Sequence, residues 1–134
     1  NLKSISFDNF NTAKVKYMNY TFAYCHSLKT LNVSNFQTTL VEDMEAMFYK
    51  CLSLKSLNLS NFITESNTNL YYTFGNCINL EYLNVAGFKT NLVTNFGGLF
   101  YNCYSLKSLN LNQHHLMLLL IFHQNHLHLQ IYFF

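Results

Sequence analysis

Four cysteines lie at a constant interval of 26 residues along this chain, at Cys25, Cys51, Cys77 and Cys103. The same interval separates the members of three further columns: Phe10, Phe36, Phe62 and Phe88; Phe22, Phe48, Phe74 and Phe100; and Leu28, Leu54, Leu80 and Leu106. A fixed period of this length is typical of repeat proteins in which each unit stacks on the one before. We therefore expect a solenoid whose function lies on a repeated surface and not in a catalytic pocket.

The period divides the chain into units. We assign one solenoid domain to residues 1–112, followed by a tail without the repeat at residues 113–134. The domain consists of a partial unit and four full units, at residues 1–8, 9–34, 35–60, 61–86 and 87–112.

The second half of each unit predicts a short strand. In the second unit Leu54, Leu57 and Leu59 form the pattern L-x-x-L-x-L, and the alternation at Leu57 and Leu59 is the period of a half-buried strand. Comparable pairs occur at Leu31/Val33, Leu83/Val85 and Leu109/Leu111. Such strands are too short to be stable alone, so we expect them to pair in parallel from unit to unit, about 4.8 Å apart.

The middle of each unit predicts a short helix. Met44, Met47, Phe48 and Cys51 follow the spacing i, i+3, i+4, i+7, which is one face of an α-helix. The expected fold class is therefore α/β, a leucine-rich-repeat solenoid of short parallel strands and short helices with a 26-residue repeat.

Two departures from the pattern predict locally weaker units. Gly97 and Gly98 fall inside the expected helix of the fourth unit, where glycine costs about 1 kcal/mol relative to alanine. In the third unit Asn67 stands where the other units have valine.

Two repeated polar columns have structural explanations. Each unit carries a threonine in the turn after its strand, at Thr12, Thr38, Thr64 and Thr90. This hydroxyl either satisfies exposed backbone groups or is simply solvated.

The spacing of the four cysteines is unlike the close cysteine pairs of zinc sites, so we expect buried free thiols. Disulfides between stacked thiols, and catalysis by Cys25 beside His26, are the weaker alternatives.

The composition argues against several partners and ligands. The net charge of +2 is too small to indicate a nucleic-acid or lipid-surface protein. The longest apolar run, residues 116–122, is too short to span a bilayer. No cofactor and no metal are expected.

The tail is the least regular part of the sequence. Five of the six histidines occur there, at His114, His115, His123, His126 and His128, and a metal site among them is a weak alternative. After Leu111 the repeat predicts another threonine-containing turn, which the tail lacks. Our hypothesis is that residues 113–134 are the product of a frameshift. The apolar tail would then cover the last unit as an accidental cap.

The repeat resembles a known family. The segments Met47-Phe48-Tyr49-Lys50-Cys51 and Leu57-Asn58-Leu59-Ser60-Asn61-Phe62-Ile63-Thr64 are similar to those of BspA-like leucine-rich-repeat surface proteins. The resemblance covers residues 1–112 and recurs in every full unit. It implies a protein that is displayed on the cell surface or secreted, and that binds proteins of a host or of neighbouring cells.

The outward positions of the strands are the candidate binding surface, because they would line one shared face. The residues selected are Lys29, Asn32, Lys55, Asn58, Glu81, Tyr82, Asn84, Lys107 and Asn110. Tyr82 is the expected anchor, since exposed tyrosine is enriched at binding hot spots. The alternative is that these residues only solvate the sheet.

The expected function is that of a non-enzymatic binding and adhesion module. Its partner would be a protein, or alternatively a glycan, contacted through the strands. The alternatives are a structural spacer in a longer surface array and a truncated gene fragment without independent function.

Overall fold

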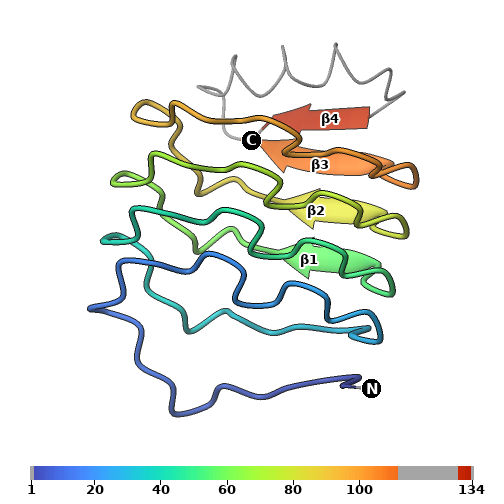
Figure 1. Ribbon diagram of the computed structural model, residues 1–134, viewed down its shortest axis with the longest axis horizontal. Coiled ribbons are helices and arrows are strands. Elements are labelled where there is room, and N and C mark those ends of the chain that lie inside the picture. Colours follow the sequence, from blue (N-terminus) through green and yellow to red (C-terminus); the bar gives the residue numbers. More distant parts are fainter. Residues whose placement is uncertain (1, 112–129, 134) are drawn as a thin grey trace.

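A computed structural model describes residues 2–111 and 130–133 of the chain as a stack of similar coils (Figure 1). One short strand from each of the later coils enters a four-stranded parallel sheet in the order β1-β2-β3-β4. The strands are β1 (Ser56–Asn58), β2 (Tyr82–Asn84), β3 (Ser108–Leu111) and β4 (Gln130–Phe133). The expected parallel strand pairing is therefore present.

The register of the sheet follows the repeat. Leu57 is opposite Leu83, which is opposite Leu109, so equivalent residues of successive units are direct neighbours. The period is not kept in β4, because Gln130 pairs with Ser108 and stands four residues before the position that the period predicts. Except for the strand β4, the predicted tail lies outside the described residues, as do its five histidines.

A second parallel ladder runs on the opposite side of each coil. Tyr17 pairs with Asp43, Asp43 with Asn69, and Asn69 with Asn95, each as an isolated parallel bridge. These bridges begin four equivalent segments, at residues 17–25, 43–51, 69–77 and 95–103, whose outer side we call the turn face. Both sides of the stack are thus joined by hydrogen bonds from coil to coil.

The predicted helices are wrong, and with them the α/β class. The part of the chain that the structure describes contains strands and turns but no helix. In the segment 43–51 alternate N–H groups, such as that of Met47, donate to the carbonyl three residues earlier. The N–H groups between them donate to carbonyls of the next coil; that of Phe48, for example, donates to the carbonyl of Thr73. Ala46 and Lys50 also have positive φ angles of 50° and 58°, which an α-helix excludes.

The spacing of the stack explains why turns replace helices. An α-helix satisfies its own backbone and is about 10 Å wide, whereas neighbouring strands lie about 4.8 Å apart. A helix in each unit would therefore force the coils to fan apart on one side. The turn segments remain at strand spacing because every second N–H group reaches the next coil.

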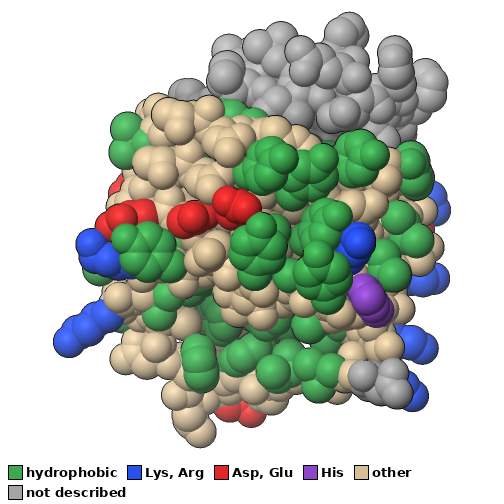
Figure 2. Space-filling view, in the orientation of Figure 1, with side chains coloured by type: hydrophobic (Ala, Val, Ile, Leu, Met, Phe, Trp, Pro, Cys, Tyr) green, Lys and Arg blue, Asp and Glu red, His purple; other side chains and the backbone are tan. Residues whose placement is uncertain are grey.

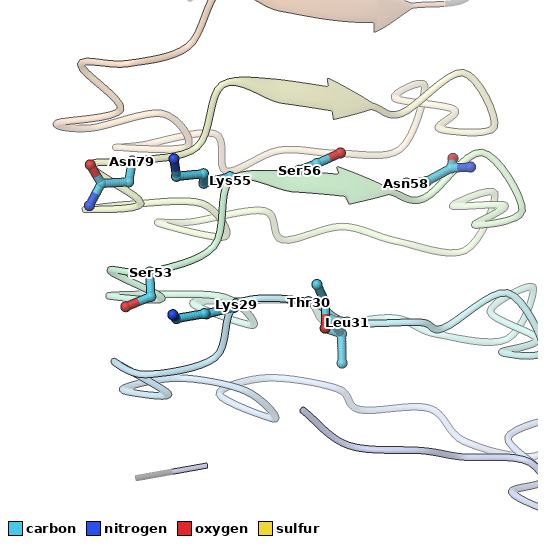
Figure 3. A pocket seen from close by; sticks show the side chains of 8 residues that line it. All are labelled: Lys29, Thr30, Leu31, Ser53, Lys55, Ser56, Asn58 and Asn79. Atoms are coloured by element: carbon cyan, nitrogen blue, oxygen red, sulfur yellow. The ribbon is translucent and has the colours of Figure 1, made fainter. Parts of the chain in front are cut away.

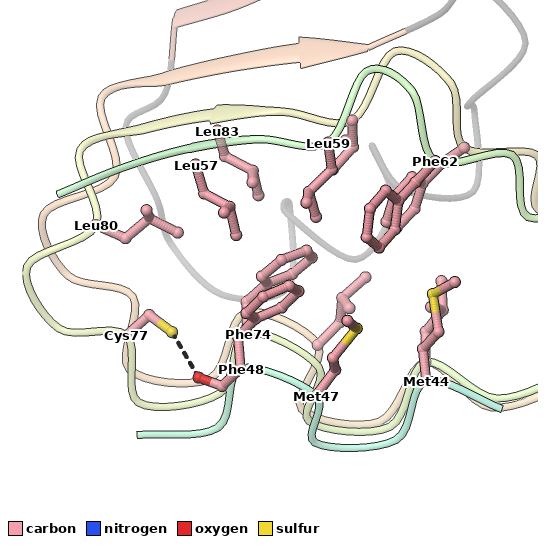
Figure 4. Close-up of a cluster of buried hydrophobic side chains, with 14 of the residues drawn as sticks. Met44, Met47, Phe48, Leu57, Leu59, Phe62, Phe74, Cys77, Leu80 and Leu83 are labelled. Carbon is pink, nitrogen blue, oxygen red and sulfur yellow. Dashed lines mark hydrogen bonds between the residues drawn. The ribbon is translucent and has the colours of Figure 1, made fainter. Parts of the chain in front are cut away.

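The core lies between the sheet and the turn segments (Figure 4). The rings of Phe22, Phe48, Phe74 and Phe100 form a continuous stack with centroids 5.6, 5.6 and 5.5 Å apart. Met44, Met47 and Leu57 surround this stack and are nearly or fully buried. Equivalent side chains therefore meet their own copies, as the period predicts.

Most members of the threonine and cysteine columns are buried and form hydrogen bonds across coils. The Thr64 hydroxyl donates to the carbonyl of Lys89 and accepts its N–H group, both at 2.7 Å. Thr12 and Thr38 make the same pair of contacts. All four cysteines are free, and only Cys25 is partly exposed. The prediction of buried free thiols is confirmed at the other three cysteines and is wrong for the burial of Cys25. A threonine that satisfies backbone groups is confirmed at Thr12, Thr38 and Thr64.

The first full unit departs from the predicted pattern. Its expected strand around Leu31 and Val33 does not form, although Val33 is buried. No backbone hydrogen bond joins residues 29–33 to residues 55–59 among the described residues, whereas the later coils pair through β1, β2 and β3. The backbone hydrogen bonds between the first and second full units lie on the turn side, such as that from Phe22 N–H to the carbonyl of Met47.

Candidate functional site

The residues selected from the sequence lie on the outer side of the strands, which we call the strand face. One column of the repeat reads Lys29, Lys55, Glu81 and Lys107 in the four successive full units. All three lysines are exposed, and Glu81 is half-buried. Tyr82, on β2, is 52% exposed, which is compatible with the anchoring role predicted for it.

Glu81 neutralises part of this column. Its carboxylate lies 2.7 Å from Nζ of Lys107 and 4.0 Å from Nζ of Lys55. The hydrogen bond from Lys107 and its charge hold the pKa of Glu81 below 4.5, and Glu81 in turn raises the pKa of Lys107. Lys29 forms no ion pair within the described residues. Positive charge is therefore in excess toward the first full unit.

The asparagine column has a structural role. Oδ1 of Asn32, Asn58 and Asn84 accepts the N–H group two residues later, at 3.1, 3.0 and 3.1 Å. This contact closes the turn at the end of each strand segment. Asn110 occupies the same column in β3. Asn32, Asn58 and Asn84 are therefore less free to bind a partner than the sequence suggests.

A shallow groove opens on the strand face between residues 29–31 and β1 (Figure 3). It has a volume of about 740 Å³. Its lining combines two lysines with small polar groups and one leucine: Lys29, Thr30, Leu31, Ser53, Lys55, Ser56, Asn58 and Asn79. The groove exists because the first full unit does not pair with β1, leaving one edge of that strand open.

Side chains reconnect the two coils beyond the groove. At one end the Ser53 hydroxyl donates to the carbonyl of His26 at 2.7 Å. At the other end Asn61 Nδ2 donates to the carbonyls of Val33 and Phe36, both at 3.0 Å. Between these contacts the outer edge of β1 presents backbone N–H and C=O groups that no neighbouring strand uses.

The groove includes only part of the predicted surface. Lys29, Lys55 and Asn58 line it, whereas Tyr82, Glu81 and Lys107 lie outside it. Ser53 and Asn79 were not selected from the sequence, because they precede the strands and only the missing pairing brings them to the groove.

The described residues contain neither a candidate metal site nor a candidate membrane-spanning helix. Within residues 2–111 and 130–133 no group of three or more His, Cys, Asp or Glu side chains could hold a metal ion. In the same part of the chain no helix is long and apolar enough to cross a membrane.

Comparison with known sequences places the chain in a family. Searches of curated proteins and of solved structures found no match. The profile of one family matches twice, over residues 2–77 and 25–117, and so covers most of the chain and all the full units. The chain therefore belongs to the repeat family described as "Mycoplasma protein of unknown function, DUF285".

Proposed function

We propose that this chain is a non-enzymatic protein-binding module of a surface-displayed or secreted protein, and that it binds through the groove on the strand face. The observation that supports this most is the open edge of β1 between Lys29 and Lys55. The resemblance of the repeat to BspA-like surface proteins supports the same role.

The chemistry of the groove favours an extended, acidic segment of a partner protein. A strand edge with unused N–H and C=O groups can pair with an added strand. The side chains of Lys29 and Lys55 are exposed beside this edge. Lys29 has no ion pair among the described residues, and Lys55 has only a long one, at 4.0 Å from the Glu81 carboxylate. Carboxylates of the partner would therefore meet two ammonium groups while its backbone pairs with β1.

Binding to cultured epithelial cells tests this proposal. The fluorescently labelled chain would be compared with Lys29→Gln and Lys55→Gln variants by flow cytometry. Lys107→Gln is the matched control, because Lys107 belongs to the same column but lies outside the groove beside Glu81. We expect each groove variant to bind several-fold more weakly, and the control to bind like the parent chain.

Treatment of the cells separates the classes of partner. Trypsin should remove binding, and glycosidases should leave it unchanged, if the partner is a protein. Binding that survives both groove substitutions but falls for Tyr82→Ala would place the site elsewhere on the strand face. Absence of binding to treated and untreated cells alike would favour the alternative of a structural spacer.

A further inference from the structure

A second hollow lies on the turn face, away from the strands. Figure 2 shows this side of the molecule, where hydrophobic and aromatic side chains gather between acidic and basic groups. The hollow has a volume of about 340 Å³. Five tyrosines and one alanine line it: Tyr20, Tyr24, Ala46, Tyr49, Tyr71 and Tyr72.

One repeat position explains the hollow. The column that contains Ala46 reads Tyr20, Ala46, Tyr72 and Gly98 in successive units. All four residues have positive φ angles, between 50° and 63°. The backbone is therefore the same in each unit, and the hollow is the space that a tyrosine would fill at position 46.

The tyrosine walls are held in place by edge-to-face contacts. The ring centroids of Tyr24 and Tyr49 are 5.5 Å apart, those of Tyr49 and Tyr72 are 5.7 Å apart, and those of Tyr71 and Tyr72 are 4.6 Å apart. Tyr72 also covers Gly98, where a Cβ atom would lie 2.6 Å from its ring. Such a preorganised aromatic wall loses little conformational entropy on binding.

The charges around the hollow favour a cation. Nζ of Lys50 already lies 5.3 Å from the ring centroids of both Tyr24 and Tyr49. The Glu45 carboxylate accepts the hydroxyl of Tyr20 at 2.7 Å and Nδ2 of Asn69 at 3.1 Å. Glu45 has no ion-pair partner among the described residues, so its negative charge at the rim is not neutralised.

We propose that this tyrosine hollow receives an arginine or lysine side chain of a partner protein. The aromatic faces would attract its charged group, as they attract Lys50, and Glu45 would pair with it. A guanidinium group fits best because it stacks on aromatic rings and is only weakly hydrated. This site is independent of the groove on the strand face and does not rest on the function proposed for it.

The first test uses two short acetylated, amidated peptides, one with two arginines and one with two citrullines in their place. Citrulline keeps the shape of arginine but has no charge. Binding would be followed by NMR through the tyrosine ring signals of the full chain. We expect the arginine peptide to shift the signals of the hollow and to bind at least five-fold more tightly than its counterpart. Equal binding of the two peptides would overturn the proposal in favour of a neutral ligand, such as a glycan.

Three variants locate the site. Ala46→Tyr should abolish binding by filling the hollow, in a backbone that already holds tyrosine at positions 20 and 72. Glu45→Gln should weaken binding several-fold while Gln still accepts the Tyr20 hydroxyl. Lys50→Asn should strengthen binding, because it removes the competing ammonium, and Asn76 and Asn102 already occupy this column with positive φ.

The direction of the Lys50→Asn effect is decisive even if Ala46→Tyr fails to fold. Weaker binding of the arginine peptide to Lys50→Asn would show that the lysine helps to hold the ligand. The proposal would then be wrong. Parent-like binding to a folded Ala46→Tyr variant would also overturn it.

Discussion

The thiol of Cys77 donates a hydrogen bond to the carbonyl oxygen of Phe48, one coil earlier, at 3.1 Å. The same carbonyl accepts the N–H group of Cys51 at 3.1 Å. Cys51 and Cys103 repeat the contact, with the carbonyls of Phe22 and Phe74. Each buried thiol is therefore a polar link between coils as well as a core side chain.

This arrangement predicts unequal thiol reactivity. Burial raises the pKa of Cys103 to about 12 and also raises the pKa values of Cys51 and Cys77. Because the thiolate is the reactive form, these three thiols should react with Ellman's reagent only as fast as the chain unfolds. Cys25, which is partly exposed, should react first. In urea all four should react together, and a folded chain that labels at two or more sites quickly would contradict the buried column.

Replacing Thr64 by valine should destabilise the stack. Valine keeps the shape of the side chain but leaves the N–H and C=O groups of Lys89 without their partner. A fully buried unsatisfied group costs about 1–3 kcal/mol, and these two groups are only partly buried, so we expect a loss of roughly 2–4 kcal/mol in urea unfolding. The control is Thr94→Val, since Thr94 is exposed and its hydroxyl makes one contact, with the carbonyl of Thr68. Similar losses for both variants would show that burial of the threonine column contributes little.

Replacing Asn67 by valine should stabilise the protein. Asn67 is fully buried, and neither its Oδ1 nor its Nδ2 has a hydrogen-bond partner. Valine occupies the same position at Val41 and Val93, so the surrounding coil already accommodates it. We expect a gain of about 1–3 kcal/mol in the free energy of unfolding. The reverse change, Val41→Asn, should cost a comparable amount, and an unchanged urea midpoint for Asn67→Val would contradict this account.

The ion pairs of Glu42 and Glu81 should make stability fall in acid. Lys16 lowers the pKa of Glu42, and Lys107 lowers that of Glu81, relative to the usual 4.5. A lowered pKa in the folded state contributes stability that is present above pH 4.5 and is lost as the pH falls through the lowered value. The urea midpoint should therefore decrease between about pH 5 and pH 3. Glu81→Gln should make this decrease of the urea midpoint shallower. The difference between the variant and the parent chain should shrink in 1 M salt. An unchanged pH dependence of the midpoint in the variant would exclude a contribution of this pair.

The sequence period predicts correctly which side chains are buried in the core, but not the backbone conformation that buries them. Met44, Met47, Phe48 and Cys51 were expected on one buried face, and all four are fully buried. A run of turns with alternating local and inter-coil hydrogen bonds presents the same residues inward as a helix would. The apolar spacing cannot distinguish the two, because it reports which side chains are buried and not which carbonyl each N–H group reaches.

The candidate sites could be predicted only in part. The exposure of Lys55 and Tyr82 follows from strand alternation. The groove beside Lys55 could not be predicted, because the sequence of the first full unit contains the strand pattern that the structure leaves unpaired there. The tyrosine hollow was missed for another reason. Tyr24, Tyr49 and Tyr72 come from different columns, so the period does not show that their rings meet.

A single substitution distinguishes the turn segments from the helices that the spacing predicted. In an exposed helix Gly98→Ala would stabilise the chain by about 1 kcal/mol. In the structure Gly98 has a φ of 63°, and a Cβ atom there would lie 2.6 Å from the Tyr72 ring. Both effects make alanine unfavourable, so we expect a loss of more than about 1 kcal/mol in the urea unfolding free energy. Tyr72→Ala should recover part of the loss by removing the ring, leaving the cost of the positive φ. A gain in stability on Gly98→Ala would instead support the helix.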